Sequence, residues 1–340
     1  MIDIKTYIIN KSKELNIDII GFTDCEALLG IKDYLIIKKK NDKYTEFEEE
    51  NLEKRTNPKL ILPNCKSIIV IGISYNLDYK LEKGINIKGS LSKSSWGLDY
   101  HKVLKNKMEE LIYEIKKKKD FQYKYFVDTG PLVDRELAKK AGIGYYGKNC
   151  SIINKDYGSF IFLGYILTDL EIEKNSIIIE EDCKDCTLCI QACPTNALES
   201  PYTLNPRRCI SYLTQTKDII PEELRHKMGI KIYGCDTCQL VCPKNKGVKR
   251  SNHSEFIPLK TKGIVNIEEL FNMSNRQFKE KYGHMAGSWR GKNILKRNAI
   301  IALGNMKDKK NLPLLEKELE KGNDNLREYI LWAINKIKTK

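Results

Sequence analysis

The stretch Cys183-Lys-Asp-Cys186-Thr-Leu-Cys189-Ile-Gln-Ala-Cys193-Pro194 decides the architecture of this 340-residue chain. Its spacing, C-x2-C-x2-C-x3-C-P, is typical of a bacterial loop that binds a [4Fe–4S] cluster. Three close cysteines can hold one cluster from a single loop, and the fourth, before the proline, is directed toward a second cluster. We therefore predict an iron–sulfur domain in the middle of the chain.

A second cysteine run completes this pattern. It consists of Cys209 and the stretch Cys235-Asp-Thr-Cys238-Gln-Leu-Val-Cys242-Pro243, separated by a 25-residue insertion over 210–234. The ferredoxin crossover predicts two ligand sets: Cys183, Cys186, Cys189 and Cys242 for cluster 1, and Cys193, Cys209, Cys235 and Cys238 for cluster 2. A zinc ribbon is the alternative, but it needs neither the third close cysteine nor the prolines. Two clusters in one small domain form an electron relay, so the chemistry is expected in the flanking segments.

The three remaining cysteines, Cys25, Cys65 and Cys150, are scattered. We interpret them as small buried hydrophobic residues, because a cytoplasmic chain uses cysteine for metals or catalysis before disulfides. The chain has no run of eighteen apolar residues, which excludes a membrane span. Its first residues lack a secretory signal pattern, so a cytoplasmic protein without a membrane partner is expected.

Charge is concentrated in the last third. From Lys244 onward there are 22 basic and 10 acidic residues, within a net charge of +14 for the whole chain. A basic domain on a near-neutral body indicates a polyanionic partner, most simply nucleic acid. The alternative is a general solubility effect in a lysine-rich protein.

The first 175 residues alternate helical and strand patterns. Helices are predicted over 2–15, 99–118 and 134–141, and strands over 17–22, 67–74, 123–127 and 159–167. This order predicts an α/β fold. The predicted domains are an α/β domain over 1–175, a ferredoxin-like domain with two [4Fe–4S] clusters over 176–246, and a basic helical domain over 247–340. In the last, 296–305 and 327–336 align at a spacing of 31, which suggests paired helices of the HEAT-like repeat type.

Two motifs in the α/β domain are misleading. Gly142-Ile-Gly-Tyr-Tyr-Gly147 matches G-x-G-x-x-G, but it follows a helix and is interpreted as a helix C-cap and turn rather than a dinucleotide site. Phe126-Val-Asp-Thr-Gly130 matches an aspartic-protease loop but occurs once. Asp128 within it lies at a strand end. If its carboxyl lies in an apolar cavity, its pKa would be raised and it could act as a general acid. The alternative is a capping or turn aspartate without a catalytic role.

The chain also resembles a known family, epoxyqueuosine reductase, over nearly its whole length. Besides both cysteine runs, the matching stretches are Glu53-Lys-Arg-Thr-Asn-Pro-Lys59, Trp96-Gly-Leu-Asp-Tyr-His101, Val127-Asp-Thr-Gly-Pro131, Ala141-Gly-Ile-Gly-Tyr-Tyr-Gly-Lys-Asn-Cys150, Arg208-Cys-Ile-Ser-Tyr-Leu-Thr-Gln-Thr-Lys217, Tyr233-Gly-Cys-Asp-Thr-Cys238 and Gly287-Ser-Trp-Arg-Gly-Lys292. The family reduces epoxyqueuosine at the wobble position of tRNA anticodons.

The resemblance implies cofactors and site residues. Cob(II)alamin in a base-off form is expected between the α/β and ferredoxin-like domains, and Leu104 replaces the glycine that the common corrinoid motif D-x-H-x-x-G requires. Asp128 is implied as the proton donor. Positions near the corrinoid are Arg55, Ser92, Asp128, Ile152, Leu163, Ser211, Asp236 and Thr237. An external ferredoxin or flavodoxin would supply electrons, and a monomer is expected.

The tRNA partner would be bound by basic residues. Phosphate or anticodon contacts are predicted at Lys217, Arg290, Lys292, Lys296 and Arg297. Trp289 could stack on a base or lie in the core, and both readings stay open. Two other functions compete: a corrinoid reductive dehalogenase, which needs no basic helical tail, and a simple electron-transfer ferredoxin, which needs no 175-residue α/β domain.

Overall fold

The computed structural model describes residues 3–81, 87–175 and 179–339. Its central sheet has the strand order β1-β2-β7-β4, with β1 at Ile19–Asp24, β2 at Ser67–Ser74, β7 at Ile161–Thr168 and β4 at Tyr123–Val127. All three strand pairs are antiparallel. All eight residues of β2 are buried, because helices cover both faces of the sheet. The four strands lie within two residues of the predicted positions.

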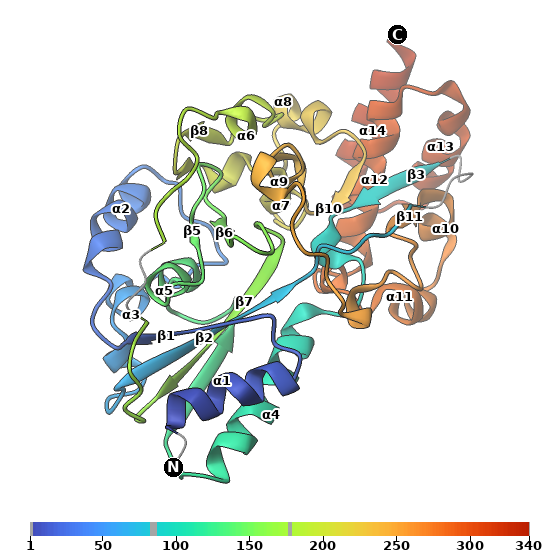
Figure 1. Ribbon diagram of the computed structural model, residues 1–340. Helices are drawn as coiled ribbons and strands as arrows, with labels where there is room; N and C mark the ends of the chain where they lie inside the picture. The colour runs from blue at the N-terminus through green and yellow to red at the C-terminus, as the bar shows by residue number, and fades with distance from the viewer. Residues whose placement is uncertain (1–2, 82–86, 176–178, 340) are drawn as a thin grey trace.

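Two helix layers enclose this sheet (Figure 1). Helices α1 (Ile4–Glu14) and α4 (Tyr100–Lys116) pack on one face, against Ile69, Ile71 and Ile73. Helices α2 (Leu29–Lys40), α3 (Leu52–Thr56) and α5 (Asp134–Lys140) lie on the other side, where α5 packs against Ile68 and Val70. The β-branched residues of β2 thus alternate between two cores. Gly142, with φ of +70°, follows α5 as the predicted C-cap and turn.

A second sheet joins the three predicted domains. Its order is β10-β3-β11, with β3 at Lys88–Leu91, β10 at Lys231–Tyr233 and β11 at Ile264–Asn266. These strands come from the predicted α/β domain, from the insertion in the ferredoxin-like domain and from the C-terminal domain. The three segments therefore share a hydrogen-bonded sheet rather than only a linker.

The iron–sulfur region consists of short elements. These are β5 (Tyr145–Tyr146), β6 (Ile152–Ile153), α6 (Leu188–Gln191), β8 (Leu198–Ser200), β9 (Thr203–Leu204), α7 (Ile210–Leu213), α8 (Glu222–Arg225) and α9 (Thr237–Leu240). Helices α6 and α9, one from each cysteine run, contact each other. Short 3-10 turns occur at Pro58–Leu60, Lys93–Ser95, Pro206–Arg208, His226–Met228, Pro243–Asn245, Ser254–Phe256, Ala286–Ser288 and Lys309–Asn311.

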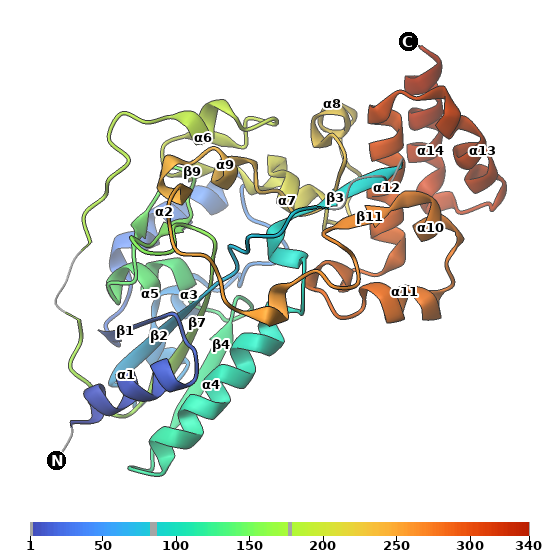
Figure 2. The same ribbon diagram turned by 45° about the vertical axis from the view of Figure 1, so that its right-hand side comes forward.

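The C-terminal segment is helical, as predicted. Its helices are α10 (Ile267–Asn272), α11 (Asn275–Tyr282), α12 (Lys292–Met306), α13 (Leu312–Glu320) and α14 (Asp324–Lys338). They lie at the opposite end of the molecule from α1 (Figure 2). Helices α12 and α14 approach closely at Gly304, where a Cβ atom would lie 2.8 Å from the Trp332 ring and 3.0 Å from Ala333 Cα. The helix pair is present, and its HEAT-like repeat character stays a prediction.

Buried polar side chains of α12 hold the insertion against these helices. Arg297 donates from Nη1 to the carbonyl oxygen of Thr216 (2.6 Å) and from Nη2 to that of Leu213 (2.7 Å). Asn298 Nδ2 donates to the carbonyl oxygens of Thr214 and Ile232, both at 2.8 Å. The insertion and the C-terminal helices accordingly share one hydrophobic core.

Two of the predicted tRNA contacts are therefore wrong. Arg297 is 3% exposed, and its guanidinium is occupied by the backbone of the insertion. Lys296 is 7% exposed and pairs with the buried carboxylate of Glu318. A side chain that is buried and internally paired cannot reach a phosphate. Their charged groups are paired within the fold instead.

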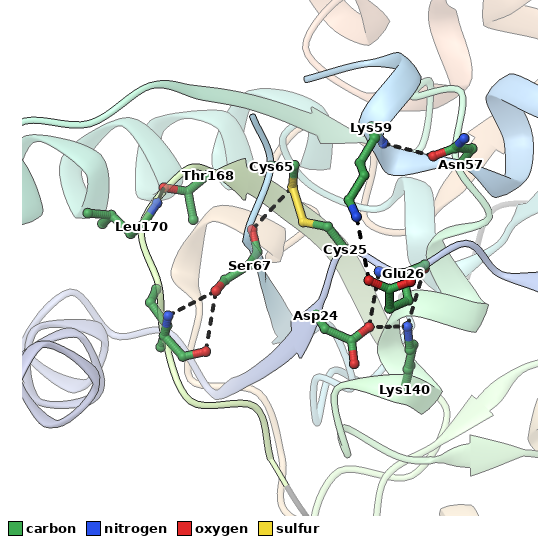
Figure 3. Close-up of a disulfide and its surroundings, with 11 residues drawn as sticks. Asp24, Cys25, Glu26, Asn57, Lys59, Cys65, Ser67, Lys140, Thr168 and Leu170 are labelled. Atoms are coloured by element: carbon green, nitrogen blue, oxygen red, sulfur yellow. Dashed lines mark hydrogen bonds and ion pairs between the residues drawn. A yellow bond between two sulfur atoms is a disulfide. The ribbon is translucent and has the colours of Figure 1, made fainter. Parts of the chain in front are cut away.

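Cys25 and Cys65 form a disulfide (Figure 3). Both are buried, as predicted, but they are bonded to each other, so the prediction of separate, unpaired cysteines is wrong. Cys25 directly follows β1 and Cys65 lies two residues before β2, so the antiparallel pairing of these strands brings the two cysteines together. Beside them Asp24 pairs with Lys140 and, at 2.9 Å, with Lys174. No helix among the described residues is long and apolar enough to cross a membrane.

We expect Asn298→Ala to destabilise the protein by about 2–4 kcal/mol, because two buried carbonyl oxygens would lose their donor. The free energy of unfolding, from denaturant titration followed by circular dichroism, measures this. Asn293→Ala, at an exposed position of the same helix, is the control and should change stability by less than about 0.5 kcal/mol. Equal effects of the two substitutions would contradict the role of Asn298.

Candidate functional site

A cavity of about 490 Å³ opens where the three segments meet. Its walls come from α2 and α3 and the segment between them, from the ends of β4 and β7, from α5, from the insertion and from Ala286. The residues that line it include Lys38, Phe47, Glu48, Arg55, Tyr100, Asp128, Asp134, Arg135, Leu163, Ser211, Gln215 and Tyr233. The volume and the mixture of apolar and polar groups suit a small-molecule site.

Four of the eight predicted corrinoid positions line this cavity: Arg55, Asp128, Leu163 and Ser211. The other four lie outside its lining. Ser92 and Ile152 are buried, at 5% and 3% exposure. Asp236 Oδ2 accepts a hydrogen bond from the Lys93 backbone (2.7 Å), and the Thr237 hydroxyl accepts one from Cys235 Sγ (3.2 Å). The structure thus brings together half of the predicted set.

Asp128 directly follows β4 and carries a side chain that is 65% exposed toward the cavity. Of the two readings that the sequence left open, a carboxyl buried in an apolar cavity does not hold, because the side chain is exposed at the open part of the cavity. The residue has φ of +56°, which is uncommon for a residue other than glycine. Tyr100 donates its hydroxyl proton to Asp128 Oδ2 (2.6 Å), and the Asp128 N–H donates to Asp134 Oδ2 (3.1 Å).

The residues around Asp128 were not singled out from the sequence. Burial, together with the charge of Asp128, raises the pKa of the Asp134 carboxyl well above its usual range. The same two causes raise the pKa of Tyr100. His101 Nε2 lies 3.8 Å from Asp128 Oδ2, and His101 Nδ1 lies 2.7 Å from Asp99 Oδ1. The only signal in the sequence was the pair Tyr100-His101 within the matching stretch 96–101.

A second cavity, of about 390 Å³, adjoins the first and shares Lys38, Glu48, Arg55 and Arg135 with it. Glu48 accepts from Lys38 (2.6 Å) and from Arg55 (3.0 Å), so its carboxylate orients both cations. Arg135 Nη1 donates to the carbonyl oxygen of Cys150 (2.5 Å). Together the two cavities offer a large site lined by cations.

The thiols predicted for cluster 1 surround a small cavity. Cys183, Cys186, Cys189 and Cys242 all line a space of about 30 Å³, closed by Lys148, Leu188 and Lys244. Cys242, from the second run, thus joins three cysteines of the first run, as the crossover predicts. Among the described residues, no three His, Cys, Asp or Glu side chains converge closely enough to hold a single metal ion. Four thiols around a cavity fit a cluster with several irons.

The thiols predicted for cluster 2 are also neighbours. Burial raises the pKa of Cys238, and the nearby thiols of Cys209, Cys235, Cys189 and Cys193 add to this. Cys193 Sγ accepts the N–H of Ala197 (3.2 Å). Cys209 and Cys235 each lie two residues from a residue that lines the large cavity, Ser211 and Tyr233. Two thiols of this set are therefore close in sequence to residues that line the large cavity.

Trp289 and the three remaining predicted tRNA residues do not line the large cavity, but Trp289 donates its indole N–H to Gln215, which does. Trp289 is 55% exposed, which decides between the two readings that the sequence left open: it is a surface residue. The Arg290 guanidinium lies over its ring, 4.1 Å from the centroid. Lys217 is exposed, and Lys292 Nζ donates to the carbonyl oxygen of Met273 (3.0 Å). Three of the five predicted tRNA residues thus keep some access to solvent.

Comparisons with known proteins agree with this site. A model of epoxyqueuosine reductase QueG matches residues 55–129, and one of a 4Fe-4S double cluster binding domain matches residues 182–245. The chain is 43% identical to the epoxyqueuosine reductase of Bacillus subtilis, covering 98% of this chain and 88% of that protein. It is also 43% identical to the enzyme of Lactococcus garvieae, covering 100% and 98%.

Solved structures have the same fold. The epoxyqueuosine reductase of Streptococcus thermophilus has a TM-score of 0.94 at 40% identity, covering 100% of this chain and 91% of that one. The Bacillus subtilis enzyme, solved with an aspartate-bearing catalytic loop swung out of its active site, has a TM-score of 0.92 at 42% identity, covering 97% and 89%. A third, solved with an epoxyqueuosine-modified tRNA-Tyr stem loop, has a TM-score of 0.89 at 39% identity, covering 97% and 98%.

Full-length identity near 40%, a shared fold and the double-cluster cysteines all lead to one conclusion: this chain belongs to the epoxyqueuosine reductase family.

Proposed function

We propose that this chain reduces epoxyqueuosine to queuosine at the wobble position of tRNA, with cobalamin bound in the large cavity and two [4Fe–4S] clusters as the electron relay. The observation that carries the proposal is the cavity wall, where Arg55, Asp128, Leu163 and Ser211 meet from different segments. The reaction removes the epoxide oxygen as water, consumes two electrons and two protons, and leaves an alkene.

Cobalamin fits the donor set of the two joined cavities. Arg55, Lys38 and Arg135 offer hydrogen-bond donors for the amide and phosphate oxygens of a corrinoid, and Leu163 and Leu132 offer apolar contact. His101, the one histidine of the Asp99-Tyr-His101 stretch, is turned toward Asp99 and Asp128, which agrees with a cobalt that takes no histidine from the protein. Bound there, the cofactor would supply the two-electron reduction of the epoxide carbon.

Asp128 is proposed as the general acid. An epoxide oxygen is a poor leaving group as a bare anion, so proton donation by a positioned carboxyl lowers the barrier. Asp134 holds the Asp128 backbone, and Tyr100 orients its carboxyl oxygen. The exposed position of Asp128 is supported by the Bacillus subtilis relative, whose aspartate-bearing loop is swung out of the active site in one structure. We infer that substrate binding encloses this carboxyl.

Electrons are proposed to enter at cluster 1 and leave through cluster 2. Ser211 and Tyr233 line the large cavity beside Cys209 and Cys235, so cluster 2 would be the nearer one. A ferredoxin or flavodoxin is proposed as the external donor. The tRNA would reach the cavity mouth at Lys217, Arg290 and Lys292, and its binding is supported by the relative solved with a modified stem loop. We keep the monomer and the HEAT-like character of α12 and α14 as parts of this proposal.

Asp128→Asn should lower kcat for epoxyqueuosine-containing tRNA by at least about 100-fold, because the amide cannot donate an acidic proton. The KM for tRNA should stay within about threefold, since the substituted side chain keeps its size. Mass spectrometry of digested nucleosides, under anaerobic conditions with a chemical reductant, measures the loss of one oxygen. Asp120→Asn, at a side chain that is 94% exposed, is the control. Unchanged turnover in Asp128→Asn would remove its role as the acid.

The crossover assignment predicts iron contents that a double substitution can test. Cys183→Ser and Cys242→Ser, combined, should lose one cluster and keep about four of about eight irons per chain. Cys183→Ser combined with Cys238→Ser should lose nearly all of the iron. Cys150→Ser should keep both clusters. Iron analysis and the electron paramagnetic resonance of the reduced protein provide the readout, and equal losses in the two double variants would contradict the assignment.

A further inference from the structure

Three side chains at the cavity mouth form a stacked group, which we call the aromatic platform: Phe47, Trp289 and Arg290. The Arg290 guanidinium lies 4.1 Å from the Trp289 ring centroid and 4.9 Å from that of Phe47. The two rings meet edge to face, with centroids 5.8 Å apart. Phe47 also lines the large cavity, so the platform begins where the cavity opens.

The platform is held in place from behind. The Trp289 indole N–H donates to Gln215 Oε1 (3.1 Å), and the same oxygen accepts from the Tyr233 hydroxyl (3.0 Å). Arg290 donates to Glu46 (3.2 Å). The indole edge is therefore fixed while much of the ring stays open to solvent, so little conformational entropy remains to be lost on binding.

The exposure of Trp289 separates it from the other two tryptophans. Trp96 and Trp332 are 5% and 9% exposed and belong to the core, whereas Trp289 is 55% exposed. If Trp289 served only to pack segments of the protein together, we would expect its ring to be buried as those of Trp96 and Trp332 are. An open, prefixed indole suits a flat aromatic ligand such as a nucleobase, which can stack on the part of the ring that Arg290 leaves uncovered.

The ion pair and the low exposure of Arg290 argue against phosphate binding. Glu46 pairs with its guanidinium, so little net charge is left to attract a phosphate. The Arg290 side chain is only 13% exposed and packs against the rings of Trp289 and Phe47, so its planar group is already used within the protein. This changes the predicted role of Arg290 from a phosphate contact to a residue that holds Trp289 in place.

We propose that the aromatic platform stacks the nucleobase next to the modified wobble nucleotide, which separates the two bases and lets the modified one enter the cavity alone. The proposal rests on the proposed function, because it takes the substrate to be tRNA. It adds a base-binding site outside the reacting centre, with an unpaired anticodon-loop nucleobase as its ligand.

Binding tests the platform without turnover. The probe is an anticodon stem-loop RNA with guanosine at the wobble position, titrated against the cluster-loaded full chain. Trp289→Ala should weaken binding roughly 5- to 100-fold, the range for loss of one base–aromatic stack, and Trp289→Phe should stay within about threefold. Leu331→Ala, at an exposed apolar residue of α14, is the matched control and should bind normally.

An abasic probe identifies the partner base. Stem loops with a single abasic nucleotide on either side of the wobble position should bind the wild type more weakly at one of the two sites. With the probe that is abasic at that site, Trp289→Ala should not weaken binding further, because the base that Trp289 stacks on is already missing. This is the non-additivity that a double-mutant cycle measures. A full additional loss in Trp289→Ala at both sites would overturn the proposal.

Tryptophan fluorescence gives a direct signal of stacking. Trp289 is the only one of the three tryptophans at the surface, so RNA should quench the intrinsic fluorescence of the wild type and leave that of Trp289→Phe nearly unchanged. If Trp289→Ala binds the stem loop as tightly as the wild type, the platform proposal fails while turnover can persist. If the platform binds RNA but modified tRNA is not reduced, the proposed function fails and the platform remains.

Discussion

The donation of Arg297 and Asn298 to the backbone of the insertion is the interaction on which the rest of the structure depends. Four backbone carbonyls, those of Leu213, Thr214, Thr216 and Ile232, receive hydrogen bonds from these two adjacent side chains. Burial lowers the pKa of Arg297 to about 10, which still leaves the guanidinium charged at neutral pH. Charged donors to buried carbonyls make hydrogen bonds stronger than neutral ones, so α12 fixes the path of residues 213–232.

The position of the cavity follows from that constraint. The insertion starts after Cys209 and ends before Cys235, so holding its backbone also holds two thiols of the second ligand set. The same backbone carries Ser211, Gln215 and Tyr233 to the cavity wall, opposite Asp128 and Leu163 at the ends of β4 and β7. The β10-β3 pairing adds a hydrogen-bonded link to the α/β segment. Helix α12, which contributes no residue to the lining of either cavity, thus places the thiols of Cys209 and Cys235 relative to Asp128.

Features that depend on local residue spacing, such as the cysteine ligand sets and the buried strand, could be predicted from the sequence. Features that depend on contacts between distant segments, such as the disulfide and the buried charges, could not. The cysteine spacing led to a ligand set in which Cys242 joins the first run, and the β-branched run at 67–74 led to a buried strand. The burial of Lys296 and Arg297 was missed because charged residues in a helix are normally expected at the surface. Here they face the insertion and Glu318, whose positions the local sequence does not reveal. The Cys25–Cys65 disulfide was missed because its partners are 40 residues apart and meet only through the β1–β2 register.

The antiparallel sheet fixes the start of the loop that carries Asp128. Val127 pairs with Gly164 at the end of β4, and the chain then leaves the sheet at Asp128 with a left-handed backbone. From there to the start of α5 the loop is held by single contacts, such as the Asp128–Asp134 hydrogen bond, rather than by a ladder. Leu132 and Val133 are buried and anchor the later part of this loop, so any change of position would be confined to residues 128–131. The cavity wall formed by β7 is therefore fixed by the sheet, while Asp128 lies on a loop outside the strand ladder.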